Sequence, residues 1–282
     1  MLKVFVDICE KLELPYYLIC GSALGAAKYQ GFIPWDDDID VGMFRKDYEI
    51  FCREAPGLLP EHLFLQNFRS DPEHPSLLTR LRNSNTTYVV KLYKERNIHH
   101  GVFIDILPLD VYPAENVEKF EKKHMHWARL RVAYLYEENC KITRAPRTVL
   151  TRKFMRLFAK NKIQSIMKKY EAFISDPSYS SDIICNHGNW QGKQEYMTRD
   201  KYGEGTMAIF EGLKVRIPSK YDEYLTQKYG DWRADLPEEE KKGHHYYEIL
   251  DLDHPYTDYI EKISRDGRRI KLRKTLPPLV DG

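Results

Sequence analysis

The chain has 282 residues, and 44 Lys and Arg against 42 Asp and Glu leave a formal net charge of +2. This near balance excludes a bulk polycation or polyanion, so any contact with a nucleic acid or a membrane must depend on local patches. Hydrophobic residues make up 42% of the chain, which excludes a disordered protein. No apolar run approaches the roughly 18 residues that span a bilayer, and Lys3 and Asp7 come too early for a signal peptide. We therefore expect a folded, cytoplasmic protein.

Short helices and strands alternate through the first part of the chain. Apolar and small residues at helical spacing predict three helices, over 2–12, 23–28 and 45–53. Apolar runs predict strands over 16–20, 39–43 and 101–107, and a strand pair or a strand and loop over 77–90. Gly21 and Ser22 are typical of a turn that caps the second helix, and Pro108 is expected to end the last strand.

The rest of the chain predicts helices over 115–136 and 221–229 among turn-rich stretches. The segment from Lys141 to Lys169 is very basic and contains no acid. It could rest on an anionic membrane or polymer, or form a solvated face. The mixture predicts an α+β or mixed α/β fold, with a mixed β-sheet core flanked by helices and with helical and turn-rich C-terminal additions. No linker divides the chain clearly, and we place one region over 1–112 and a second over 113–282, which could also form one domain.

Four aspartates are crowded into five residues, at Asp36, Asp37, Asp38 and Asp40. Such crowding raises carboxyl pKa values unless a cation relieves it. Strand alternation would put Asp38 and Asp40 on one face, where both can reach one divalent ion, most naturally Mg²⁺. The alternative is a solvated acidic turn before a strand.

Asp105 interrupts an apolar run that reads as a central strand, where an unpaired charge is costly. If this strand neighbours the aspartate strand, Asp105 faces the same cation as Asp38 and Asp40, which gives a three-carboxylate site of the kind used for phosphoryl transfer. The alternative is an ion pair with Arg80 or Arg82. These two arginines could instead bind phosphates, or form surface ion pairs. Lys28 is a weaker candidate of the same kind.

Several segments together resemble the LicD family. The residues that carry the resemblance are 17–27, 31–43, 80–83 with 85–87, 101–110, 229–232 and 236–245. The resemblance spans about residues 1–250. It implies a nucleotidyltransferase-like catalytic core over 1–112, a substrate-binding region over 113–282, and a relationship to the fukutin and fukutin-related ribitol-phosphate transferases. The family usually has a longer N-terminal helical segment, so we expect this chain to begin late in that pattern.

The resemblance implies a role for several residues. Gly21 and Ser22 would hold a donor phosphate, since backbone N–H groups at a helix N-terminus bind anions, although a simple helix cap is the alternative. Asp38 and Asp40 would ligate Mg²⁺ or Mn²⁺, with Asp36 as an additional ligand. Asp105 would complete the metal site or act as the base.

Trp35 and the pair His244 and His245 are further candidates for substrate binding. Trp35 could face a quaternary ammonium group by a cation–π contact, and the alternative is core packing. His244 and His245 match the family's paired histidines, and no step is assigned to them.

The function that the resemblance implies is Mg²⁺-dependent transfer of a phospho-alcohol, such as phosphocholine, from a CDP-linked donor. The acceptor would be a hydroxyl of a glycan, a lipid-linked polysaccharide or a teichoic-acid precursor, with CMP released. Peripheral contact with an anionic membrane at the inner face of the cell membrane is a further expectation, and nucleic acid is not expected as a partner. The alternatives are a nucleotidyltransferase that uses the same metal site, and a non-catalytic protein that binds polyanions.

Overall fold

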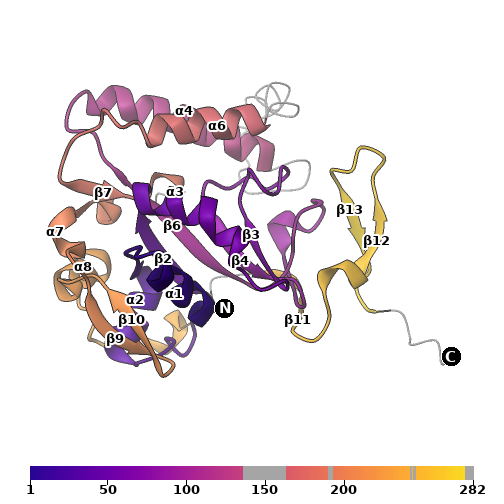
Figure 1. Cartoon of the computed structure of the whole chain (residues 1–282), viewed down its shortest axis with the longest axis horizontal. Helices are drawn as coiled ribbons and strands as arrows, with labels where there is room; N and C mark the ends of the chain where they lie inside the picture. The colour runs from indigo at the N-terminus through magenta and orange to yellow at the C-terminus, as the bar shows by residue number, and fades with distance from the viewer. Residues whose placement is uncertain (136–162, 190–192, 242, 244–245, 277–282) are drawn as a thin grey trace.

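The computed structural model describes residues 1–135, 163–189, 193–241, 243 and 246–276. It is a mixed α+β structure, as the sequence predicts (Figure 1). The helices are α1 (Leu2–Lys11), α2 (Cys20–Lys28), α3 (Arg45–Glu54), α4 (Val117–Leu135), α6 (Ile163–Ile174), α7 (Arg199–Tyr202) and α8 (Tyr221–Tyr229). The helices predicted near 2–12, 45–53, 115–136 and 221–229 are therefore confirmed.

Within the described residues, seven strands form one mixed sheet with the order β1-β2-β6-β4-β3, to which β7 is added beside β6 and β8 beside β7. Its strands are β1 (Tyr17–Leu18), β2 (Asp40–Phe44), β3 (Leu63–Gln66), β4 (Thr79–Asn83), β6 (Phe103–Val111), β7 (Ile183–Cys185) and β8 (Met197–Thr198). β2 and β6 run parallel, whereas the other neighbours are antiparallel. The sheet thus combines strands from both sides of residue 112.

The strand predicted to end at Pro108 continues past it, and that expectation is wrong. β6 pairs with β4 through residues 103–106 and with β7 through residues 110 and 111. Pro108 lies in the interval between these two antiparallel partners, where its missing N–H breaks no ladder on that side. The Pro108 carbonyl is still satisfied, because Asn186 Nδ2 donates to it at 2.8 Å.

The start of α2 also differs from the prediction. Gly21 and Ser22 do not form a turn before the helix but belong to its first turn, since α2 begins at Cys20. The chain changes direction at Cys20 itself, whose φ of 54° lies in the left-handed region. The Ile19 N–H still donates to the carbonyl of Asp40, at 3.1 Å. The pairing between the first two strands therefore reaches Ile19, the residue before Cys20.

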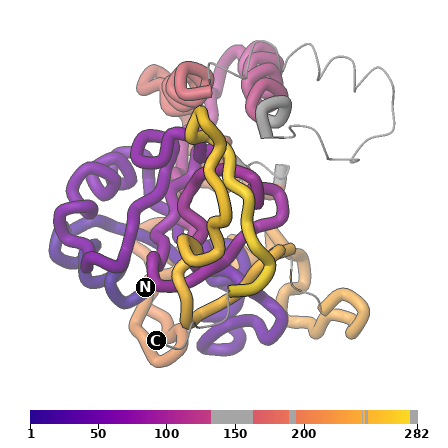
Figure 2. The backbone as a smooth tube through the Cα atoms, turned by 90° about the vertical axis from the view of Figure 1, so that its right-hand side faces the viewer, coloured from indigo at the N-terminus to yellow at the C-terminus, as the bar shows by residue number. Residues whose placement is uncertain are grey.

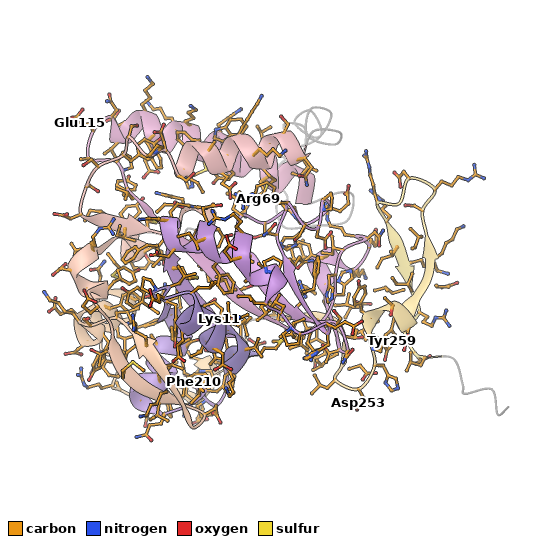
Figure 3. The ribbon with its side chains drawn as sticks, in the orientation of Figure 1. Lys11, Arg69, Glu115, Phe210, Asp253 and Tyr259 are labelled. Atoms are coloured by element: carbon orange, nitrogen blue, oxygen red, sulfur yellow. The ribbon has the colours of Figure 1, made fainter. Side chains whose placement is uncertain are left out.

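Helices α4 and α6 lie side by side along one side of the sheet, and the two views agree on this (Figures 1 and 2). Arg69 connects this layer to the rest of the fold (Figure 3). Its Nη2 lies 2.5 Å from Glu171 of α6 and 3.3 Å from Glu49 of α3. No helix within the described ranges is both long and apolar enough to cross a membrane.

The C-terminal part adds small two-stranded sheets around the main one. They pair β9 (Thr206–Phe210) with β10 (Leu213–Ile217), β5 (Thr87–Val90) with β11 (Tyr247–Asp251), and β12 (Ile260–Ile263) with β13 (Ile270–Leu272). The two strands predicted within 77–90 exist as β4 and β5, but each pairs with a different partner. The β12–β13 hairpin stands apart at one end of the molecule (Figure 1).

Candidate active site

A cavity of about 880 Å³ opens over one end of the sheet. Its walls come from α2, the segment before β2, strands β2, β4 and β6, helix α8, and one residue of α4. The acidic side chains among its lining residues are Asp36, Asp38, Asp40, Asp105, Glu195 and Asp231, and the basic ones are Lys28, Arg80, Arg131 and Lys228. The cavity therefore collects opposite charges that lie far apart in the sequence.

Three charged residues stand next to one another across the sheet floor. Asp40 on β2 is in register with Asp105 on β6, and Asp105 is in register with Arg80 on β4. Directly opposed residues of neighbouring strands point to the same face, so all three side chains share the cavity side. The predicted adjacency of the two aspartate strands is confirmed by this register.

Asp105 is engaged by Arg80, the ion pair that the sequence left open as an alternative. Arg80 Nε donates to Asp105 Oδ1 at 2.7 Å, and Nη2 lies 3.4 Å from Oδ2. The guanidinium also lies over the ring of Phe103, 3.9 Å from its centroid. Its third nitrogen, Nη1, is buried and donates no hydrogen bond within the described part of the chain. Arg80 is thus fixed in place with one donor unused.

Asp40 is electrostatically strained. Burial raises the pKa of its carboxyl well above the usual range, and the charges of Asp38 and Asp105 raise it further. Asp38 lies just before β2 rather than within it, so strand alternation is not what brings it to Asp40. The backbone of Asp40 is held separately, because its N–H donates to Ser22 Oγ at 2.9 Å.

These carboxylates were tested for their fit to a divalent ion. No group of three or more His, Cys, Asp or Glu side chains has metal-binding geometry among the described residues. Asp38 and Asp40 nevertheless offer hard oxygen ligands whose mutual repulsion a cation would relieve. Mg²⁺ in phosphate-handling sites is commonly held by one or two carboxylates, with substrate phosphates and waters completing the shell. The residues present fit an ion held in that way.

Asp36 lies against the first turn of α2. A Cβ built on Gly21 would come within 2.4 Å of Asp36 Oδ2, so only glycine leaves space for this carboxylate. Gly21 lines the cavity, whereas Ser22 is buried and is not part of the lining in the described structure. A hydrogen bond to the Asp40 backbone is the contact that Ser22 Oγ makes here.

Two of the basic residues predicted to bind phosphate are used within the fold. Lys28 Nζ donates to the carbonyls of Arg233 and Ala234 at 2.9 and 3.0 Å and pairs with Asp235 at 3.1 Å. Arg82 is buried outside the cavity lining, and it donates to Gln66 Oε1 and the Gly101 carbonyl, both at 2.5 Å. Only Arg80, of the two predicted arginines, therefore lines the cavity.

Trp35 lines the cavity and packs edge-on against Tyr29, with ring centroids 6.4 Å apart. A cation already lies over it, since Lys241 Nζ is 5.3 Å from its ring centroid. His244, His245 and the basic segment up to residue 162 lie outside the described residues. Their predicted roles stay predictions.

Sequence reasoning missed several lining residues. Cys20 lies in the cavity beside Asp40. Lys228 of α8 pairs with Glu195 at the same wall. Lys228 directly precedes the Tyr229–Trp232 segment, which is a signal that could have identified it. Arg131, in the middle of a charged helix, has no comparable signal.

Comparison with known proteins shows which proteins this chain resembles. Residues 13–136 match the family described as LicD/FKTN/FKRP, nucleotidyltransferase domain, and this segment contains the aspartates, Gly21 and Arg80. The chain is 27% identical over 257 residues to the lipopolysaccharide cholinephosphotransferase LicD of Haemophilus influenzae, a match that covers 89% of this chain and 94% of that protein. It is 40% identical over 45 residues to the human ribitol 5-phosphate transferase FKRP, which covers 16% of this chain and 9% of that protein. The resemblance indicated by the motifs is thus confirmed.

Proposed function

Since residues 13–136 of this chain match the LicD family model, we propose that the protein is a phosphotransferase that moves a phospho-alcohol from a CDP-linked donor to a hydroxyl of a glycan. CMP is the other product. The observation that carries the proposal is the row formed by Asp40, Asp105 and Arg80 on the floor of one cavity, within the segment shared with the family. Carboxylates for a divalent ion beside a guanidinium for phosphate are the parts that phosphoryl transfer needs.

Each residue has a task in this reaction. Asp38 and Asp40 would hold Mg²⁺, with Asp36 alongside, and the bound ion neutralises charge on the donor's pyrophosphate. Arg80 directs Nη1, its unused donor, at a phosphate oxygen. Asp105 keeps Oδ1 bonded to Arg80, whereas the longer contact at Oδ2 leaves that oxygen able to take the proton of the acceptor hydroxyl. Oδ2 is thus the oxygen through which Asp105 would act, either as the base or as a further ligand of the ion.

The acceptor class follows from the relatives and from the cavity. The Haemophilus influenzae relative acts on lipopolysaccharide, by its name. The cavity lining includes Trp35 and Tyr29, aromatic rings suited to an alcohol headgroup or a sugar. We propose a cell-surface polysaccharide or teichoic-acid precursor as the acceptor and phosphocholine or a similar phospho-alcohol as the transferred group.

The proposal is tested by a product assay. The protein is incubated with Mg²⁺, with CDP-choline, CDP-ribitol or CDP-glycerol, and with a panel of glycan acceptors, and CMP and the acceptor mass are both measured. We expect one donor to give CMP together with an acceptor that has gained the phospho-alcohol, with all CMP release lost in EDTA and restored by Mg²⁺ or Mn²⁺. An acceptor that gains a nucleotide would establish nucleotide transfer instead. Polyanion binding without any turnover across the panel would favour the non-catalytic alternative.

Gly21→Ala should lower the transfer rate without destabilising the fold. The added Cβ would displace the Asp36 carboxylate by about 1 Å, and a misplacement of that size can cost about 10²-fold in rate. Alanine is itself a better helix former than glycine, so the free energy of unfolding should fall by less than about 1 kcal/mol or should rise. Initial rates and urea denaturation measure the two effects.

Gly57→Ala is the matched control, because a Cβ built on Gly57 meets no atom within 4 Å. This variant should keep both the rate and the stability. Equal rates for the Gly21 and Gly57 variants would remove Asp36 from the proposed site.

A further inference from the structure

The end of the cavity that Arg131 of α4 lines carries guanidinium donors with no acceptor among the described residues. Arg80 Nη1 and Arg131 Nε are both buried and make no hydrogen bond in the described structure, although both residues line the cavity. A buried charged donor that lacks an acceptor is costly, and such groups are rare in folded proteins. Arg80 is only 8% exposed, so bulk water does not satisfy its unpaired donor.

The same region has an excess of positive charge. His74 is fully buried and neither of its ring nitrogens is hydrogen-bonded in the described structure. Burial lowers the pKa of His74 well below its usual range, and the charges of Arg80, Arg82 and Arg131 lower it further. Three guanidinium groups therefore lie near one imidazole. Arg82 donates to neutral oxygens, which do not balance its charge. Arg80 contacts Asp105 through Nε and Nη2 and not through Nη1.

We propose that Arg80 and Arg131 form a binding site for a phosphate group at the α4 end of the cavity. A phosphate offers several oxygens to two separate N–H donors, and guanidinium groups match its geometry. Its charge would also compensate the arginines that surround His74. Arg131 comes from α4, outside the short segments that carry the resemblance but within residues 13–136, which match the family model.

The position of this site separates it from the aspartates. Arg80 lies two strands away from Asp40, which is about 10 Å at the usual strand spacing. We assign the proposed phosphate to the side of this row that carries Arg80, where Arg131 also lines the cavity. It belongs either to the CDP-linked donor or to a phosphate-carrying acceptor. This identification rests on the proposed function, whereas binding of phosphate itself does not.

The test measures anion binding without divalent ions. Melting temperatures of the full chain are titrated with pyrophosphate and with inorganic phosphate, at constant ionic strength set by chloride, and apparent Kd values are fitted. We expect Arg131→Gln to weaken pyrophosphate binding about 10-fold to 100-fold, the usual range for loss of a charge-assisted hydrogen bond. Arg131→Lys should recover part of the affinity, because lysine restores the positive charge but not the planar, paired N–H donors of a guanidinium.

Arg129→Gln is the matched control, since Arg129 is an exposed arginine two residues away on the same helix. It should bind pyrophosphate as the unchanged protein does. Equal Kd values for the Arg131 and Arg129 variants would overturn the site. So would an Arg131→Gln protein whose melting temperature falls without ligand while its anion-induced shift is kept, because that pattern indicates a structural role.

Transfer kinetics then identify the source of the phosphate. A rise in KM for the CDP-linked donor in Arg131→Gln assigns the site to the donor, and a rise in KM for a phosphate-carrying acceptor assigns it to the acceptor. Pyrophosphate binding that depends on Arg131 in a protein without transferase activity would refute the proposed function and keep the site. Full transferase activity with Kd values that do not depend on Arg131 would do the reverse.

Discussion

Asp40→Asn should lower the rate of phospho-alcohol transfer by about 10³-fold or more while the fold is retained. The bound cation contributes several kcal/mol of transition-state stabilisation, and each 1.36 kcal/mol corresponds to tenfold in rate. Asp40 is also the carboxylate whose pKa is raised by both Asp38 and Asp105, so it lies at the centre of the charge that the cation would relieve. Initial rates at saturating Mg²⁺ measure the effect.

Asp37→Asn is the matched control. It removes the same charge from the same run of aspartates, but Asp37 is exposed and is not among the cavity-lining residues of the described structure. We expect a rate within a few-fold of the unchanged protein. If the Asp40 and Asp37 variants had equal rates, the assignment of the metal site to this loop would be wrong.

The same substitution should change how stability depends on pH. The pKa of Asp40 is higher in the folded state than the unfolded value of about 4, so the folded state holds the proton more tightly. The free energy of unfolding should therefore fall as pH rises from about 4 through the raised pKa of Asp40, and it should fall less in Asp40→Asn. Urea denaturation across this range in the absence of divalent ions shows the difference. Mg²⁺ should stabilise the unchanged protein more than the variant.

The local elements could be predicted from the sequence because their signals are local. Apolar spacing fixes α1, α3 and α8, and the apolar run around Asp105 fixes β6. The partners of the strands could not be predicted in the same way. β5 pairs with β11, about 160 residues later, and periodicity carries no information about which strands meet.

The candidate site, too, could be predicted only in part from the sequence. Asp36, Asp38, Asp40 and Asp105 were identified from crowding and from one charge in an apolar strand, and they line one cavity. Composition cannot distinguish a basic residue that faces a ligand from one whose donors are all bonded to oxygens of the protein itself. Lys28 and Arg82 are satisfied by protein oxygens, whereas Arg80 keeps a free donor. That difference depends on carbonyls and amides supplied by distant segments, so it emerges only in three dimensions.

Asp110→Ala should destabilise the protein by about 3–5 kcal/mol. Arg45 of α3 binds Asp110 of β6 with both Nε and Nη2, each at 2.7 Å, and the aspartate is fully buried. Removal of Asp110 leaves Nε and Nη2 of a largely buried arginine without their acceptor, with Nη1 still 3.1 Å from Glu49, and breaking a buried pair in this way is the costly case. Arg45 also lies 3.5 Å from Glu171 of α6, so the loss should loosen the contact between the sheet and the α4–α6 layer. Urea denaturation measures the change.

Two further variants separate the cost of an orphaned charge from the worth of the pair. Asp7→Ala removes an exposed ion pair with Lys3 on α1 and should cost less than about 1 kcal/mol. The double variant Arg45→Met with Asp110→Leu replaces both charges by apolar groups, and it should recover much of the stability that Asp110→Ala loses. A double variant as unstable as the single one would show that the pair itself, and not the orphaned guanidinium, holds α3 to β6. Asp105 lies on β6 five residues before Asp110, so the ion pair between Arg45 and Asp110 also helps to position the strand that carries the proposed base.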